Sequence, residues 1–134
     1  MNQALKKIAQ SVRNDILTMS YNAQSAHMGG ALSVVEILVS LYFNVMNVNT
    51  NNSLDPARDR LVLSKAHDAK ALYSVLARRG FFDLKVLDGY EKDGGNCQDT
   101  LHATACREWK LQQVRLDMDY LWQQEWRTEY LLHV

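Results

Sequence analysis

The sequence changes character within residues 25–38, which read SAHMGGALSVVEIL. Residues 20–32 are mostly small or polar and include paired glycines, which is typical of a loop. Ser33 and Glu36 have the spacing of a capping box, in which each side chain satisfies a free backbone N–H at a helix start. Leu32 and Ile37 have the spacing of a hydrophobic staple across the same helix start. The stretch therefore predicts a loop that contains His27, followed by a helix that begins at Ser33.

The predicted helix continues to Met46 and is apolar almost all round. A helix of this composition is buried on several sides. In a small domain, we expect the segment 34–46 to be a central helix or a subunit interface.

The flanking sequence predicts further short elements. Residues 3–19 have apolar side chains at helical spacing and form an amphipathic helix. Residues 47–56 are a polar connection, and residues 60–63, RLVL, can form a short strand. Residues 68–79 again have helical spacing. Gly80 suits a left-handed helix stop, and Asp83 can cap a short helix that runs to about Tyr90.

The bulk composition narrows the possible classes of protein. A chain of 134 residues is long enough for one domain. The fifteen basic and fifteen acidic residues cancel, so charge gives no case for nucleic acid or an anionic membrane as partner. No signal core or membrane-spanning apolar run is present, and we expect a cytoplasmic protein. The spacing of Cys97 and Cys106 predicts neither a disulfide framework nor a metal site.

His27 and His67 are the candidate chemical residues. His27 lies beside Gly29 and Gly30, and His67 follows Ser64-Lys65-Ala66 at the start of the next helix. A histidine at a helix start is a plausible phosphate ligand because the helix dipole and free N–H groups favour an anion. Considered alone, each histidine has the alternative of being an ordinary hydrogen-bonded surface residue.

Three segments together carry a family resemblance. They are residues 25–38, residues 58–67 (RDRLVLSKAH) and residues 71–73 (ALY). They closely resemble the transketolase patterns G-H-x-G-x-x-L-S, D-R-x-x-L-S-K-G-H and A-L-Y. The resemblance covers about residues 5–95 and is nearest to the split form, in which the amino- and carboxy-terminal halves are separate chains.

The resemblance implies a thiamine diphosphate enzyme that moves a two-carbon ketol unit between sugar phosphates, with Mg²⁺ in the family. His27 matches the histidine that faces the substrate and the transferring oxygens. His67 matches the histidine that approaches the cofactor diphosphate and the reacting carbon. Lys65 is characteristic of the split branch and is a candidate cofactor-binding residue. Implied partners are a carboxy-terminal transketolase subunit and a second copy of the chain.

This chain departs from the family pattern at three neighbouring positions. Ala66 replaces a glycine, Asp68 replaces a small residue, and Lys70 lies where the split branch often has proline. A carboxylate at position 68 is unfavourable near a diphosphate unless Lys65 or Lys70 offsets its charge. The nearby residues 58–60, RDR, are expected to form a salt-bridged turn rather than a ligand set.

The composition changes after Gly95, because both cysteines and all three tryptophans fall beyond it. A family member would continue with K-L-P-G-H and then P-G-[I/V]-E-x-S-T-G-S-L-G-H-G-L. New codons can be built from the third base of one codon and the first two bases of the next. The shifted codon across Asn96 and Cys97 then always encodes leucine, whichever synonymous codons the gene uses for these two residues. The same rule forces glutamate across 109–110, glycine across 118–119, leucine across 119–120 and alanine across 122–123.

These forced residues fall where the family pattern requires them, so we expect a net one-base shift near the codon of Gly95. Residues 1–95 are then the family portion, and residues 96–134 are an out-of-frame tail. The alternative is that residues 117–134 form a real helix, since their apolar residues are loosely periodic. The family's magnesium and diphosphate motif, which starts with G-D-G, does not occur in the 134 residues.

The expected fold class follows from the resemblance. The family domain is α/β, and the fragment itself is expected to be mostly helical with at most one or two short strands. We expect it to be inactive alone, with no appreciable binding of thiamine diphosphate. Two alternatives are a helical module that docks on intact transketolase-like subunits through the 34–46 face, and a degenerate product without a role.

Overall fold

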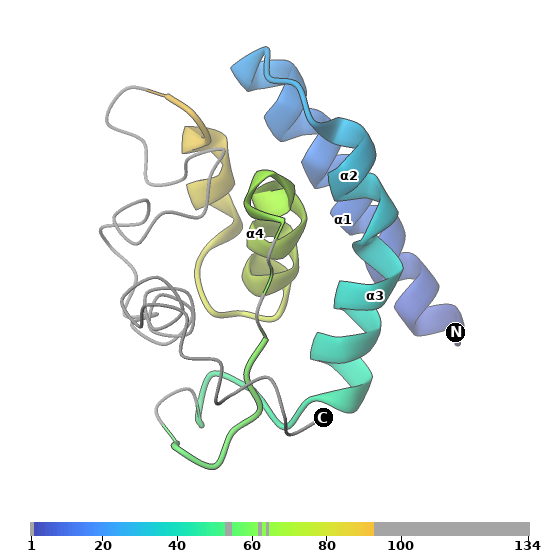
Figure 1. The fold of residues 1–134 in the computed structure, drawn as a ribbon, viewed down its shortest axis with the longest axis vertical. Helices are drawn as coiled ribbons and strands as arrows, with labels where there is room; N and C mark the ends of the chain where they lie inside the picture. Colours follow the sequence, from blue (N-terminus) through green and yellow to red (C-terminus); the bar gives the residue numbers. More distant parts are fainter. Residues whose placement is uncertain (1, 53–54, 62, 64, 93–134) are drawn as a thin grey trace, which may run out of the picture.

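The computed structural model describes residues 2–52, 55–61, 63 and 65–92. These residues form a small helical assembly, drawn in Figure 1. Its α-helices are α1 (Gln3–Ala23), α2 (Met28–Ser33), α3 (Val35–Ser40) and α4 (Ala69–Arg78). A π-helical turn η1 (Leu41–Val45) and two 3₁₀ segments, η2 (Ala66–Asp68) and η3 (Leu84–Gly89), complete it. The expected mostly helical fragment is confirmed.

α1 begins and packs as its sequence predicts. The side chain of Asn2 accepts a hydrogen bond from the Leu5 N–H at 2.9 Å, which caps the helix. One face of α1 is buried, and its buried apolar residues recur at helical spacing: Ala9, Val12, Ile16 and Met19. The helix predicted over 3–19 is confirmed, and it continues to Ala23.

The chain reverses after α1, and α2 and α3 return beside it (Figure 1). The predicted loop over 20–32 is therefore wrong at both ends, because only residues 24–27 separate α1 from α2. α2 is helical although Gly29 and Gly30 have low helix propensity. The close packing of α2 on η2 offsets this low propensity. At position 30 only glycine fits, because an added Cβ atom would clash with the side chain of Asp68.

The predicted capping box at Ser33 is also wrong. Ser33 is the last residue of α2, and its hydroxyl donates to the carbonyl of Gly30 at 2.6 Å. Glu36 instead accepts a hydrogen bond from Arg13 of α1, and this bond lowers the pKa of the Glu36 carboxyl. Ile37 is exposed, so it does not form the buried contact that a staple requires. The tertiary pair between α1 and α3 outcompetes the local motif.

The segment 34–46 is not the central helix. Val35, Leu38, Val39 and Tyr42 are buried against the rest of the core. On the other side of the same segment, Ile37 is 59% exposed and Val45 is 65% exposed. Within the described residues, the central-helix alternative is therefore wrong, and the alternative of a subunit interface stays a prediction.

α4 is the central helix instead. It lies between the α1–α3 layer and η3 (Figure 1). Every residue from Ala69 to Ala77 is buried, and these include the polar side chains Lys70 and Ser74. Ser74 and Arg78 both donate to the carboxylate of Asp15 on α1, Arg78 through two bonds of 2.6 and 2.7 Å. These long-range pairs allow a helix with polar residues to lie at the centre.

The last elements follow their local signals. Gly80 has φ +89°, the left-handed conformation predicted for the stop after α4. The side chain of Asp83 accepts from the Lys85 N–H at 2.9 Å and caps η3, which is a 3₁₀ helix. None of the described residues among 60–63 is in a strand, and Val62 lies outside the described set. The tail predicted over 96–134 also lies outside it.

A transmembrane helix would need about 20 consecutive apolar residues, and no helix in the described part of the chain meets that requirement.

Candidate cofactor site at two helix starts

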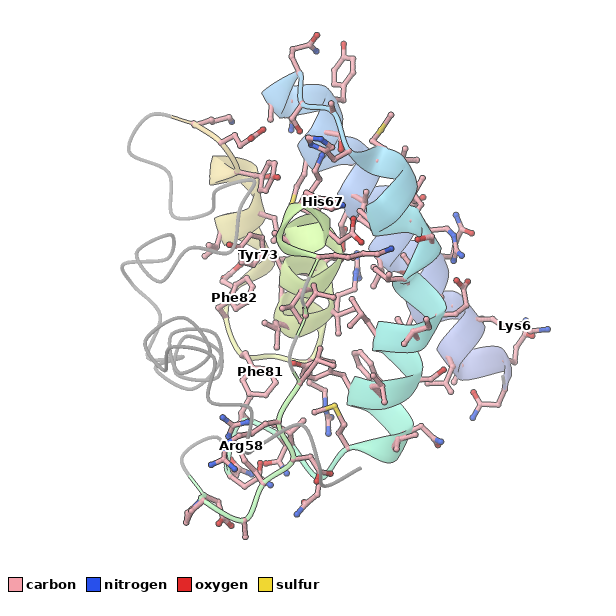
Figure 2. The ribbon with its side chains drawn as sticks, in the orientation of Figure 1. Lys6, Arg58, His67, Tyr73, Phe81 and Phe82 are labelled. Atoms are coloured by element: carbon pink, nitrogen blue, oxygen red, sulfur yellow. The ribbon has the colours of Figure 1, made fainter. Side chains whose placement is uncertain are left out.

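The two predicted histidines lie side by side. His27 is the residue immediately before α2, and His67 is in η2, immediately before α4. Their ring centroids are 5.5 Å apart, with an angle of 47° between the ring planes. Figure 2 shows His67 at the end of α4 that faces the start of α2. Two segments that are far apart in the sequence thus bring two imidazoles to one place.

Backbone geometry directs His27 toward this place. His27 has φ 61° and ψ 32°, in the left-handed region, and Gln24 at the other end of the same turn has φ 51°. Residues other than glycine adopt this region uncommonly. The turn 24–27 therefore requires support from the residues packed around it.

Gly30 sets how closely α2 approaches η2. A Cβ atom added at Gly30 would lie 2.2 Å from Oδ1 of Asp68 and 3.1 Å from its Cγ. An added Cβ at Gly29 would meet no atom within 4 Å, so the space on that side is open. The paired glycines thus have different roles, because only Gly30 is needed for the contact between the two helix starts.

Asp68 is a buried carboxylate next to His67. Its side chain is fully buried, and neither oxygen has a hydrogen-bond partner within the described residues. The nearest cationic groups are Nζ of Lys65 at 3.9 Å and Nε2 of His67 at 3.8 Å. Lys65 is therefore positioned to offset the charge of Asp68, as the sequence required of either Lys65 or Lys70.

Lys70 does not hydrogen-bond to Asp68, and its partners lie on the turn before His27. Its Nζ donates to the hydroxyls of Ser20 at 3.1 Å and Ser25 at 3.0 Å, and to the carbonyl of Ala26. Ala26 directly precedes His27 in the chain. The sequence identified Lys70 only as a departure from the family pattern. The available signal was a lysine between two alanines in the first turn of the predicted helix.

The residues around the two imidazoles suit an anionic group. His67 is 51% exposed and Lys65 is 56% exposed, so both can donate hydrogen bonds outward while Asp68 stays covered. His67 and Lys65 also lie just before α4, where the helix dipole and free N–H groups favour an anion. In the described part of the chain, no cluster of three or more His, Cys, Asp or Glu side chains is arranged to hold a metal ion.

The turn at residues 58–60 contributes backbone structure rather than ligands. The Asp59 side chain accepts from the Asn47 N–H at 2.6 Å, and Arg58 donates to the Asp59 carbonyl at 2.9 Å. Arg60 donates to the Pro56 carbonyl at 3.1 Å. These three bonds to the backbone help to hold the turn, and the expected salt bridge there stays a prediction.

Comparison with known proteins gives a family match over most of the chain. The model of the family described as "Transketolase, thiamine diphosphate binding domain" matches residues 4–99. Among curated proteins, the 6-deoxy-6-sulfo-D-fructose transketolase subunit SqwG of Clostridium sp. (strain MSTE9) is 47% identical over 68 residues. This alignment covers 51% of this chain and 25% of the relative.

Two further relatives support the same match. A subunit of the apulose-4-phosphate transketolase of Phocaeicola vulgatus is 35% identical over 86 residues, covering 64% of this chain and 31% of the relative. The transketolase of Homo sapiens is 38% identical over 79 residues, covering 59% of this chain and 13% of the relative. The chain thus spans between a quarter and a third of the two bacterial relatives.

Proposed function

Since this chain belongs to the transketolase family, in its thiamine diphosphate-binding domain, we propose that it is an amino-terminal portion of a ketol-transferring enzyme. The proposed reaction moves a two-carbon unit between sugar phosphates. The observation that carries the proposal is the 5.5 Å separation of the His27 and His67 rings at two helix starts.

The side chains have separate roles in this proposal. Thiamine diphosphate, when bound, supplies the carbon nucleophile and the electron sink. His67 and Lys65 donate hydrogen bonds to the diphosphate. His27 faces the substrate and handles protons at its oxygens, since imidazole can both accept and donate near neutral pH. The carboxylate of Asp68 is compatible with a diphosphate nearby, because it is buried and lies next to Lys65 and His67.

The proposed partners follow from the family. Two of the relatives are named as transketolase subunits, which supports a separate carboxy-terminal subunit for an intact protein of this type. We propose sugar phosphates as substrates, and a second copy of the chain as a further partner. The relatives' named sugars do not select a substrate for this chain.

We also propose that the 134-residue chain is inactive by itself. The family's G-D-G motif is not among its residues, and a one-base shift of frame beyond Gly95 would allow the quoted family pattern. Calorimetric titration of the chain with thiamine diphosphate and Mg²⁺ is expected to give no measurable heat of binding. Tight binding would contradict the need for the missing motif.

The reading frame can be tested directly. The DNA downstream of codon 95, read in the alternative frame, is expected to encode G-D-G and, further on, an asparagine. A chain expressed with the frame restored is expected to bind thiamine diphosphate, and His67→Ala in that chain is expected to weaken binding. An immediate stop codon in the alternative frame would refute the shift.

One observation favours a second candidate function. Ile37 and Val45 are large apolar side chains that remain exposed on the 34–46 segment. Such a face suits docking on an intact transketolase-like protein. Co-elution of the purified chain with such a protein, lost in the Ile37→Lys variant, would support this module. Absence of both co-elution and cofactor binding in the frame-restored chain would favour a product without a role.

A further inference from the structure

Lys70 is a buried lysine whose partners all lie on one structural feature. Its side chain is fully buried, which is rare for lysine unless the ammonium is paired. Its three oxygen partners are the hydroxyls of Ser20 and Ser25 and the carbonyl of Ala26. Three acceptors match the three N–H donors of an ammonium group. The ring of Tyr90, 5.7 Å away, adds a cation–π contact.

These partners bracket the turn that precedes His27. Ser20 is in the last turn of α1, and Ser25 and Ala26 are the two residues before His27. The turn contains two non-glycine residues with positive φ, Gln24 and His27. Such conformations persist only where the surroundings determine them. The ammonium of Lys70 binds both sides of the turn and supplies this constraint.

The same short segment of chain also carries His67. Lys70 lies three residues after it, at the start of the central helix α4. η2 therefore carries His67, and the first turn of α4 carries Lys70, which binds the backbone beside His27. We propose that Lys70 is a positioning residue, which fixes the 24–27 turn so that the His27 imidazole stays beside that of His67.

Lys70→Met removes the ammonium and leaves the oxygens of Ser20, Ser25 and Ala26 without this donor, so the loss falls on the turn. Methionine has nearly the length of lysine and would fill the same volume. We therefore expect Lys70→Met to keep the packing of α4 but to lose the fixed conformation of the 24–27 turn. The proposal rests on the proposed function, which explains why the two imidazoles lie together. Its test uses no cofactor.

The test measures the ring-to-ring nuclear Overhauser effect in the full chain labelled at its histidine rings. A His27–His67 cross-peak is expected in the parent chain and in Lys6→Met. Lys6 is an exposed lysine on the first turn of α1, far from the site (Figure 2), so Lys6→Met is the matched control. The cross-peak is expected to be lost in Lys70→Met, while circular dichroism still shows the parent helix content.

A second variant keeps the proposal testable if Lys70→Met does not fold. Ser25→Ala removes one acceptor from the turn and leaves α1 and α4 unchanged, and it is expected to weaken the cross-peak. An unchanged cross-peak in folded Lys70→Met would overturn the proposal. If only Ser25→Ala folds, an unchanged cross-peak there overturns it. Failure of the frame-restored chain to bind thiamine diphosphate would refute the proposed function and leave this result unaffected.

Discussion

The contact between Gly30 and Asp68 gives a sharp prediction about how the two helix starts meet. In Gly30→Ala, the new methyl group would lie 2.2 Å from Oδ1 of Asp68, and 3.1 and 3.3 Å from the other carboxylate atoms. Asp68 is fully buried, so its carboxylate has to move against packed neighbours. Such overpacking costs about 1–3 kcal/mol. The gain in helix propensity from glycine to alanine, about 1 kcal/mol, offsets part of this cost.

Gly29→Ala is the matched control because it changes the same residue type one position earlier. Its methyl group meets no atom within 4 Å, so only the propensity gain remains. We expect Gly29→Ala to be more stable than Gly30→Ala by about 1–3 kcal/mol, the cost of overpacking. Urea denaturation followed by circular dichroism measures this difference in the free energy of unfolding.

A double-mutant cycle then identifies the cause. Asp68→Ala removes the carboxylate, so Gly30→Ala is expected to lose its penalty in that background. The coupling between the two positions should be about 1–3 kcal/mol, within the range for residues in direct contact. Equal stabilities of Gly29→Ala and Gly30→Ala, or a coupling near zero, would refute the close approach of α2 to η2.

Two ion pairs are expected to affect the free energy of unfolding by different amounts. Arg78→Met removes the two-bond contact with Asp15 between α4 and α1, and is expected to lower the free energy of unfolding by about 1–3 kcal/mol, measured in urea. The hydrogen bond from Arg13 lowers the pKa of the Glu36 carboxyl. The pair therefore stabilises the fold at pH values above the ordinary glutamate pKa of 4.5. This stabilisation is lost as the pH falls through the lowered pKa. Because both side chains are substantially exposed, the effect is expected to be only about 0.2–1 kcal/mol. Comparing the parent chain with Glu36→Gln in urea between neutral and acidic pH checks it, and a difference that grows on acidification would contradict the sign.

Local signals were sufficient for several elements. Apolar spacing located α1 and α4, Gly80 marked the end of α4, and Asp83 was identified correctly as the cap of η3. Each of these features depends on interactions within one or two helical turns. The family match over residues 4–99 likewise agrees with the resemblance in the quoted motifs.

Local signals failed where a distant residue competed for the same group. Ser33 and Glu36 had the right spacing for a capping box, but Arg13 binds Glu36. The paired glycines suggested a loop, but residues 28–33 are helical and Gly30 lies close against Asp68. The 34–46 segment was more apolar than α4, yet α4 is central because Asp15 and the 20–26 region supply partners for its buried polar side chains.

The amino-acid sequence alone identified His27, His67 and Lys65 as candidate site residues and located α1 and α4. The tertiary structure decided that the two imidazoles lie side by side, that Asp68 is buried next to His67, and that Lys70 binds the turn before His27. The physical reason is the range of the interactions. Helix periodicity and capping act between near neighbours, whereas hydrogen bonds and close packing between α1, α2 and α4 join residues that only the folded chain brings together.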